Sequence, residues 1–170
     1  PNKMPSDIFK GKKLSIGFDP NLFTDKSLIF FFRNSKLKFK PILQNLIDKI
    51  WKRKLIKNKN KFYLLPNGAV SEKYQIKVNK ISKYLKEKKS DFLFVTASEN
   101  NAWLLNIRGK DTKYTPIPHS YILIDKDKNI KFFCDLKKIS KHLRRYLRKI
   151  EFIDIRNCYK ILLKIKKKKI

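Results

Sequence analysis

Glycine, cysteine and histidine are scarce in this chain of 170 residues, and each shortage excludes a kind of site. None of the four glycines, at positions 11, 17, 68 and 109, belongs to a GxGxxG or P-loop pattern, so no phosphate-cradling loop is predicted. Cys134 and Cys158 lack CxxC spacing and are expected to be free, buried thiols. His119 and His142 have no acidic or cysteine partners at metal-ligand spacing. We therefore predict no metal site and no cofactor in this chain.

Long apolar runs are missing as well. No run approaches the roughly 20 residues that a membrane-spanning helix needs, so no membrane association is predicted. No nucleophile stands beside a recognisable base, and no catalytic residue is predicted. The chain begins at Pro1 instead of Met, so we expect that its start is not the native one. Free thiols and the absence of a visible secretory segment favour a cytoplasmic location.

Basic residues, in contrast, are abundant. The chain has 43 Lys+Arg against 14 Asp+Glu, a net charge of +29, which is typical of proteins that bind nucleic acid or anionic membranes. Only seven of these residues are arginine, the side chain that binds phosphate bidentately. High Lys, Ile and Asn with only three Ala is the composition that an AT-rich genome imposes. We interpret the charge as a solvated surface and expect no specific nucleic-acid partner, although a free-standing basic nucleic-acid-binding module stays an alternative.

Hydrophobic residues make up 42% of the chain, enough for a folded core. Residues 14–18 and 39–43 are predicted strands, with a helix between them that begins near Thr24. This segment has too little apolar material for a whole domain, so residues 1–44 are interpreted as the C-terminal part of a first domain. Residues 45–64 are predicted to be a linker, and its apolar residues are expected to dock on a neighbouring surface: Leu46, Ile47, Ile50 and Trp51.

Residues 65–170 alternate between helical and strand patterns and are interpreted as a second domain. A stripe at spacings of four, three and four predicts a first helix, and Phe92–Val95 reads as a central strand because its apolar run is continuous. Ser98 is expected to cap a helix through Asn106, which Gly109 ends in a left-handed conformation. The remaining elements are a hairpin over 121–134, a helical stripe over 136–147, a strand over 152–155 and a helix over 158–165. The pattern predicts an α/β fold with a mixed sheet flanked by helices.

The segment from Thr96 to Tyr121 has the most distinctive sequence. It is predicted to place Trp103, Asn106, Arg108 and Asp111 around a helix end and the loop that follows. Two interpretations are open. Either the segment only packs, with Arg108 paired to Asp111 or to a backbone carbonyl, or its loop binds a partner, as loops on rigid scaffolds often do.

This segment resembles the second domain of three-domain aminopeptidase P enzymes, which remove the N-terminal residue that precedes proline. The family pattern there is approximately A-L-D-E-I-A-W-L-L-N-I-R-G-x-D-x-x-x-x-P-V-F-x-S-Y. The matching positions are Ala97, residues 102–109, Asp111, Pro116, Ser120 and Tyr121. Residues 16–20 are similar to the family's G-x-D-P near the end of its first domain, and residues 45–51 are similar to its N-L-V-D-K-I-W linker.

The resemblance implies a ribonuclease H-like sheet of the creatinase/prolidase N-terminal type, preceded by a partial domain of the same type. In the family, a separate C-terminal domain holds two divalent metal ions, usually manganese, and performs the cleavage. Residue 170 falls where that domain would begin, so we expect the chain to be an inactive fragment of the parent enzyme. Its expected partners are the catalytic domain, a second copy in a homodimer and peptides with proline second.

The resemblance also suggests a role for the distinctive segment. The family's N-terminal domains shape the mouth of the active site, which implies a substrate-entrance or interdomain loop formed by Trp103, Asn106, Arg108, Asp111 and Tyr114. Trp103 is expected to anchor the helix behind this loop. A prolidase or a creatinase-like enzyme is the alternative parent, because specificity resides in the catalytic domain.

Overall fold

The computed structural model describes residues 8–11, 13–32, 36–51 and 58–165. The chain divides into two compact units, residues 1–56 and 57–170. The division falls inside the segment predicted to be a linker.

The first unit is built on a parallel β-α-β motif. Strands β1 (Ser15–Phe18) and β2 (Lys38–Pro41) pair in parallel, with helix α2 (Asp25–Phe32) between them in the chain. Thr24 caps α2 as predicted: the backbone N–H of Ser27 donates to Thr24 Oγ1 at 3.2 Å, and the N–H of Thr24 donates to Ser27 Oγ at 2.8 Å. These reciprocal bonds satisfy two donors at the start of the helix.

The predicted linker contains a short helix, α3 (Leu46–Ile50). Asn45 begins it, because its Oδ1 accepts from the Ile47 N–H at 2.9 Å while its Nδ2 donates to Asp19 at 2.8 Å. Hydrogen bonds from the Asn21 backbone and from Asn45 lower the pKa of Asp19. The linker's apolar side chains are largely exposed, and their docking on a neighbouring surface stays a prediction: Leu46, Ile47, Ile50 and Trp51.

The second unit contains a four-stranded mixed sheet in the order β4-β6-β7-β8. Its strands are β4 (Phe92–Val95), β6 (Ser120–Asp125), β7 (Ile130–Cys134) and β8 (Ile150–Asp154). The first three pair in antiparallel fashion, whereas β7 and β8 are parallel. The prediction of Phe92–Val95 as a central strand is wrong, since β4 lies at an edge. Its run is apolar because both faces of this edge strand contribute to hydrophobic clusters.

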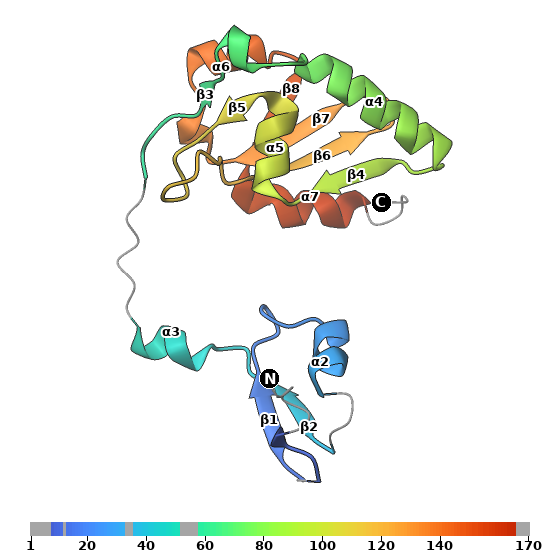
Figure 1. Ribbon diagram of the computed structural model, residues 1–170, viewed down its shortest axis with the longest axis vertical. Coiled ribbons are helices and arrows are strands. Elements are labelled where there is room, and N and C mark those ends of the chain that lie inside the picture. The colour runs from blue at the N-terminus through green and yellow to red at the C-terminus, as the bar shows by residue number, and fades with distance from the viewer. Residues whose placement is uncertain (1–7, 12, 33–35, 52–57, 166–170) are drawn as a thin grey trace. The chain divides into compact units, whose positions relative to one another are not determined.

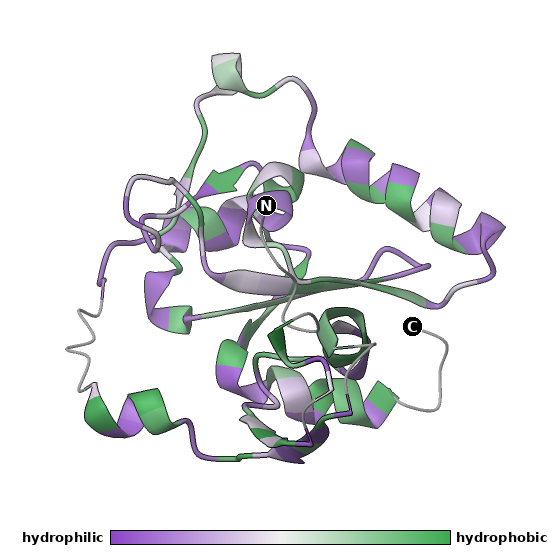
Figure 2. Ribbon diagram, turned by 60° about the horizontal axis from the view of Figure 1, so that its bottom comes forward, coloured by the Kyte–Doolittle hydropathy of each residue, from purple (hydrophilic) through white to green (hydrophobic). Residues whose placement is uncertain are grey.

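Helices cover both faces of this sheet (Figure 1). Helices α4 (Tyr74–Glu87), α5 (Ser98–Leu105) and α6 (Lys141–Tyr146) contribute to the larger core, and α7 (Cys158–Ile165) packs on the opposite face. Phe132 belongs to the larger core and Phe133 to the other, both fully buried. Each burial contributes about 2–3 kcal/mol. Figure 2 shows hydrophobic residues along the strands and alternating polar and apolar residues along α4.

Shorter elements complete the second unit. Strands β3 (Tyr63–Leu64) and β5 (Ile107–Arg108) form an antiparallel pair. The described residues of this unit also contain three 3₁₀ turns: η1 (Asn67–Ala69), η2 (Leu136–Lys138) and η3 (Ile155–Asn157). The stripe over 136–147 divides into η2 and α6, because Asp135 caps the first and Ser140 caps the second.

The predicted fold class, a mixed sheet flanked by helices, is confirmed. Within the described residues, every helix is too short or too polar to span a lipid bilayer.

Candidate functional site

A buried lysine connects the first two helices of the second unit. The side chain of Lys77, on α4, reaches α5, where its Nζ donates to the carbonyl of Trp103 at 2.6 Å and to Asn106 Oδ1 at 2.7 Å. The same Nζ lies 4.1 Å from the centre of the Trp103 ring, in a cation–π contact. Burial lowers the pKa of Lys77; Glu72 opposes this effect and Arg108 adds to it.

Asn106 ends α5 in the left-handed conformation, with φ 56° and ψ 34°. Its Nδ2 donates to the carbonyl of Glu72 at 2.9 Å, so both ends of its amide are bound. The prediction that Gly109 supplies the left-handed stop is therefore wrong, because Asn tolerates this conformation when its side chain is hydrogen-bonded. Ser98 does not cap the helix either: its hydroxyl contacts Ser120 on β6.

Gly109 instead allows two backbone segments to approach each other closely. A Cβ at this position would lie 2.7 Å from Pro118 Cα and 3.1 Å from the carbonyl oxygen of Ile117. Both contacts are with backbone that follows the loop 110–116, and the Gly109 N–H donates to the Pro116 carbonyl at 3.3 Å. The two ends of the loop therefore meet at a residue without a side chain.

Arg108 binds backbone carbonyls, one of the two alternatives that its sequence position left open. Its guanidinium donates to the carbonyls of Ala102 at 3.2 Å and Ile107 at 2.8 Å. The arginine thus adds a second donor to the Ala102 carbonyl, which also accepts from the Asn106 N–H at the end of α5.

Asp111 pairs with Lys138 rather than with Arg108. Only 3% of the Asp111 side chain and 12% of the Lys138 side chain are exposed, so this ion pair is largely removed from water. The other carboxylate oxygen of Asp111 accepts from the His119 N–H at 2.9 Å. Asp111 therefore ties the loop both to η2 and to its own return strand.

Tyr114 lies at the tip of this loop. It is 92% exposed and has a positive φ of 64°, which is costly for a residue with a side chain. The turn beneath it is closed by a bridge between Thr112 and Thr115. A hydrogen-bonded turn thus presents one exposed aromatic ring.

The structure brings together three of the five predicted site residues and separates the other two. Trp103, Asn106 and Arg108 lie around Lys77, whereas Asp111 and Tyr114 belong to the loop. Trp103 does not anchor α5 through burial, since 58% of it is exposed.

Sequence reasoning missed Lys77, although a signal was present. The buried positions of α4 are Tyr74, Lys77, Val78, Ser82 and Leu85, so one lysine falls on the apolar stripe. A cation at such a position needs buried acceptors, which indicates a specific polar contact.

Two carboxylates lie at the end of the parallel strands, a placement that the sequence did not reveal. Asp135 follows β7 and Asp154 ends β8, but each carboxylate caps the turn after its strand, and Asp154 also binds Arg156. Among the described residues, no group of three or more His, Cys, Asp or Glu side chains is placed to hold a metal ion.

Comparisons with known proteins identify the family. Residues 53–170 match the creatinase/prolidase N-terminal domain. Protein pid-5 of Caenorhabditis elegans is 26% identical over 84% of this chain, and the putative Xaa-Pro aminopeptidase FRA1 of Saccharomyces cerevisiae is 31% identical over 72%. The chain covers only 14% and 19% of these two relatives.

A solved structure agrees with this assignment. An X-prolyl aminopeptidase from Caenorhabditis elegans, described as a cytosolic enzyme with a di-nuclear active site, superposes with a TM-score of 0.76. It is 27% identical, and the match covers 90% of this chain and 26% of that protein. On these sequence and structural matches together, the chain belongs to the creatinase/prolidase N-terminal domain family.

Proposed function

We propose that this chain is the non-catalytic N-terminal portion of a Xaa-Pro aminopeptidase-like metallopeptidase, an enzyme that removes the N-terminal residue preceding proline. The similarity to putative Xaa-Pro aminopeptidases and to a solved X-prolyl aminopeptidase supports this assignment. The chain corresponds to about a quarter or less of these proteins, so its role is to support chemistry performed elsewhere in the parent. Two divalent metal ions, manganese being the expected metal, would be held there, and the enzyme would act in the cytosol.

The observation that carries the proposal is the loop 109–119. Its ends are joined by the hydrogen bond from the Gly109 N–H to the Pro116 carbonyl and held by the Asp111–Lys138 ion pair, while Tyr114 at its tip is almost fully exposed. A loop that is held at both ends and exposes an aromatic residue is suited to contact another surface, because its base is already ordered before binding. We propose that this loop lines the active-site entrance or contacts the catalytic domain, and that it supports assembly of the enzyme.

Substitutions in the full-length parent protein test this role. Tyr114→Ala is expected to lower kcat/KM about tenfold, a loss of about 1.4 kcal/mol in transition-state stabilisation, without changing metal content. Arg108→Ala is expected to weaken turnover or dimer assembly, and Arg108→Lys should not restore it, because lysine lacks the planar fork. Tyr159→Ala removes another exposed aromatic, on α7, and is the matched control.

Two results would contradict the proposal. The first is wild-type kinetics and assembly for both Tyr114→Ala and Arg108→Ala. The second is activity of the purified 170-residue chain itself, measured as release of the first amino acid from a peptide with proline second. Activity of the isolated chain would place a reactive centre within it.

A further inference from the structure

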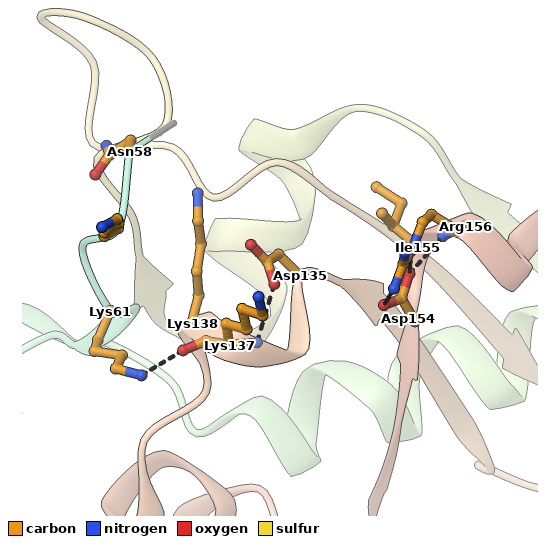
Figure 3. Close-up of a pocket in the computed structure, with 9 residues that line it drawn as sticks. Asn58, Lys61, Asp135, Lys137, Lys138, Asp154, Ile155 and Arg156 are labelled. Carbon is orange, nitrogen blue, oxygen red and sulfur yellow. Dashed lines mark hydrogen bonds and ion pairs between the residues drawn. The ribbon is translucent and has the colours of Figure 1, made fainter. Parts of the chain in front are cut away.

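A hollow outside the predicted site lies at the end of the parallel strand pair. Three segments line it: residues 58–61 ahead of β3, the turn η2 that follows β7, and residues 154–156 at the end of β8 (Figure 3). Its volume is about 620 Å³, within the usual range of small-molecule sites. The carboxyl ends of parallel strands are the common position for ligands in α/β sheets.

The lining is positively charged. It contains the cations Lys59, Lys61, Lys137, Lys138 and Arg156, and the carboxylates Asp135 and Asp154. Arg156 is neutralised by Asp154, and Lys138 by Asp111 behind it. The remaining charged groups are the carboxylate of Asp135 and three lysines, Lys59, Lys61 and Lys137. The hollow therefore has an excess of two positive charges.

The amines in the hollow differ in what they already bind. The Lys61 amine donates to the backbone carbonyl of Lys137 and is held in place. The amines of Lys59 and Lys137 have no acceptor among the described residues. Lys59 and Lys137 belong to different segments of the lining, so a ligand between them would be contacted from two sides.

The chemistry of these groups selects the kind of anion. The Arg156 fork is already occupied, because its Nε and a terminal nitrogen each lie 2.8 Å from an oxygen of Asp154. No free planar fork is therefore left to recognise a carboxylate bidentately. Lysines act as point charges and suit the three oxygens of a phosphate group. A divalent cation is disfavoured, since the excess charge repels it.

We propose that this hollow binds the phosphate group of a small molecule, with Lys59 and Lys137 as the principal contacts and Lys61 as a positioned third. The volume is large compared with a phosphate ion, so a phosphate ester fills it better than inorganic phosphate does. Ile155, the apolar residue of the lining, would contact the organic part of the ester.

Isothermal titration of the 170-residue chain at physiological salt tests the proposal, with AMP, inorganic phosphate and adenosine as probes. AMP is expected to bind more tightly than inorganic phosphate, and adenosine is expected not to bind. The double variant Lys59→Gln/Lys137→Gln should weaken AMP binding at least about tenfold, since each removes a charged hydrogen bond. Lys137→Arg, which keeps the charge, should retain most of the affinity.

A charge-matched control separates a built site from general attraction to a basic protein. Lys83→Gln/Lys164→Gln removes the same charge from exposed positions outside the hollow and should leave AMP affinity within about twofold. Equal weakening by the two double variants would overturn the proposal, as would the absence of AMP and phosphate binding at 10 mM. Binding of a 20-nucleotide single-stranded DNA that is tighter than AMP binding and equally sensitive to both variants would also overturn it, in favour of diffuse nucleic-acid attraction.

Discussion

Replacing Lys77 by methionine tests whether the buried amine stabilises the second unit. Methionine keeps the apolar stem of the side chain but leaves Asn106 Oδ1 without its donor and the carbonyl of Trp103 with only the long bond from the Asn106 N–H, at 3.4 Å. A buried acceptor that loses its donor costs about 1–3 kcal/mol, and the lost cation–π contact adds about 1 kcal/mol. Because methionine is uncharged, the variant avoids the desolvation of a buried ammonium group, and this offsets part of the loss. We expect a net loss of about 2 kcal/mol in the free energy of unfolding, or about 6–10 °C in Tm for a unit of this size.

The measurement needs a probe that reports the second unit alone. Trp51 and Trp103 are the two tryptophans, one in each unit, so a Trp51→Phe background makes the fluorescence specific for Trp103. Urea unfolding followed by this signal gives the free energy, and a shift of native emission reports the loss of the ammonium group above the ring. Lys83→Met on the same helix, whose side chain is 81% exposed, is the control and should change stability by less than about 0.5 kcal/mol.

Two outcomes would refute this reasoning. Equal stability of Lys77→Met and Lys83→Met would mean that the contacts of Lys77 contribute nothing net. A Lys77→Met variant more stable than the parent would mean that the desolvation of the ammonium group exceeds what its partners return.

Three further predictions concern the loop and the core. Gly109→Ala should lower the free energy of unfolding by about 1–3 kcal/mol, because its Cβ would meet backbone, whereas Gly68→Ala, with open space around it, should be nearly neutral in the same urea titration. Asp111→Asn should cost about 3 kcal/mol by leaving Lys138 unpaired, and adding Lys138→Gln should recover part of that loss. Burial raises the pKa of the Cys134 thiol to about 12, so the stability that the neutral thiol contributes is complete below pH 9 and is lost as the pH rises toward 12. Slow iodoacetamide labelling of the native protein at pH 8.5, together with fast labelling in urea, checks this burial. Fast labelling of a native Cys158→Ser variant would contradict it.

Local patterns predicted most of the secondary structure. The Thr24 cap, the hairpin between β6 and β7 and the helix over 158–165 follow from neighbours in the sequence, and all three are present. The edge position of β4 did not follow, because an apolar run reports that both faces are covered but not whether a strand lies on each side.

The contacts of the candidate site were less predictable, because they join residues far apart in the sequence. Asp111 had Arg108 nearby in the chain, yet its partner is Lys138, which the fold brings close. Asn106, and not Gly109, is the left-handed residue, and its amide is bound by Lys77 and by the Glu72 carbonyl, both distant in the sequence. Whether the five predicted residues serve an entrance stays a prediction for the full-length protein.

The position of α7 has a consequence for proteolysis. Leu123, Phe133 and Ile153 pack under this helix, and α7 is the helix that covers them among the described residues. Cleavage between β8 and α7 would detach α7 from the sheet and leave these side chains in water. A protein nicked there should therefore bind hydrophobic dyes and self-associate, whereas nicking at Tyr114 should leave it monodisperse.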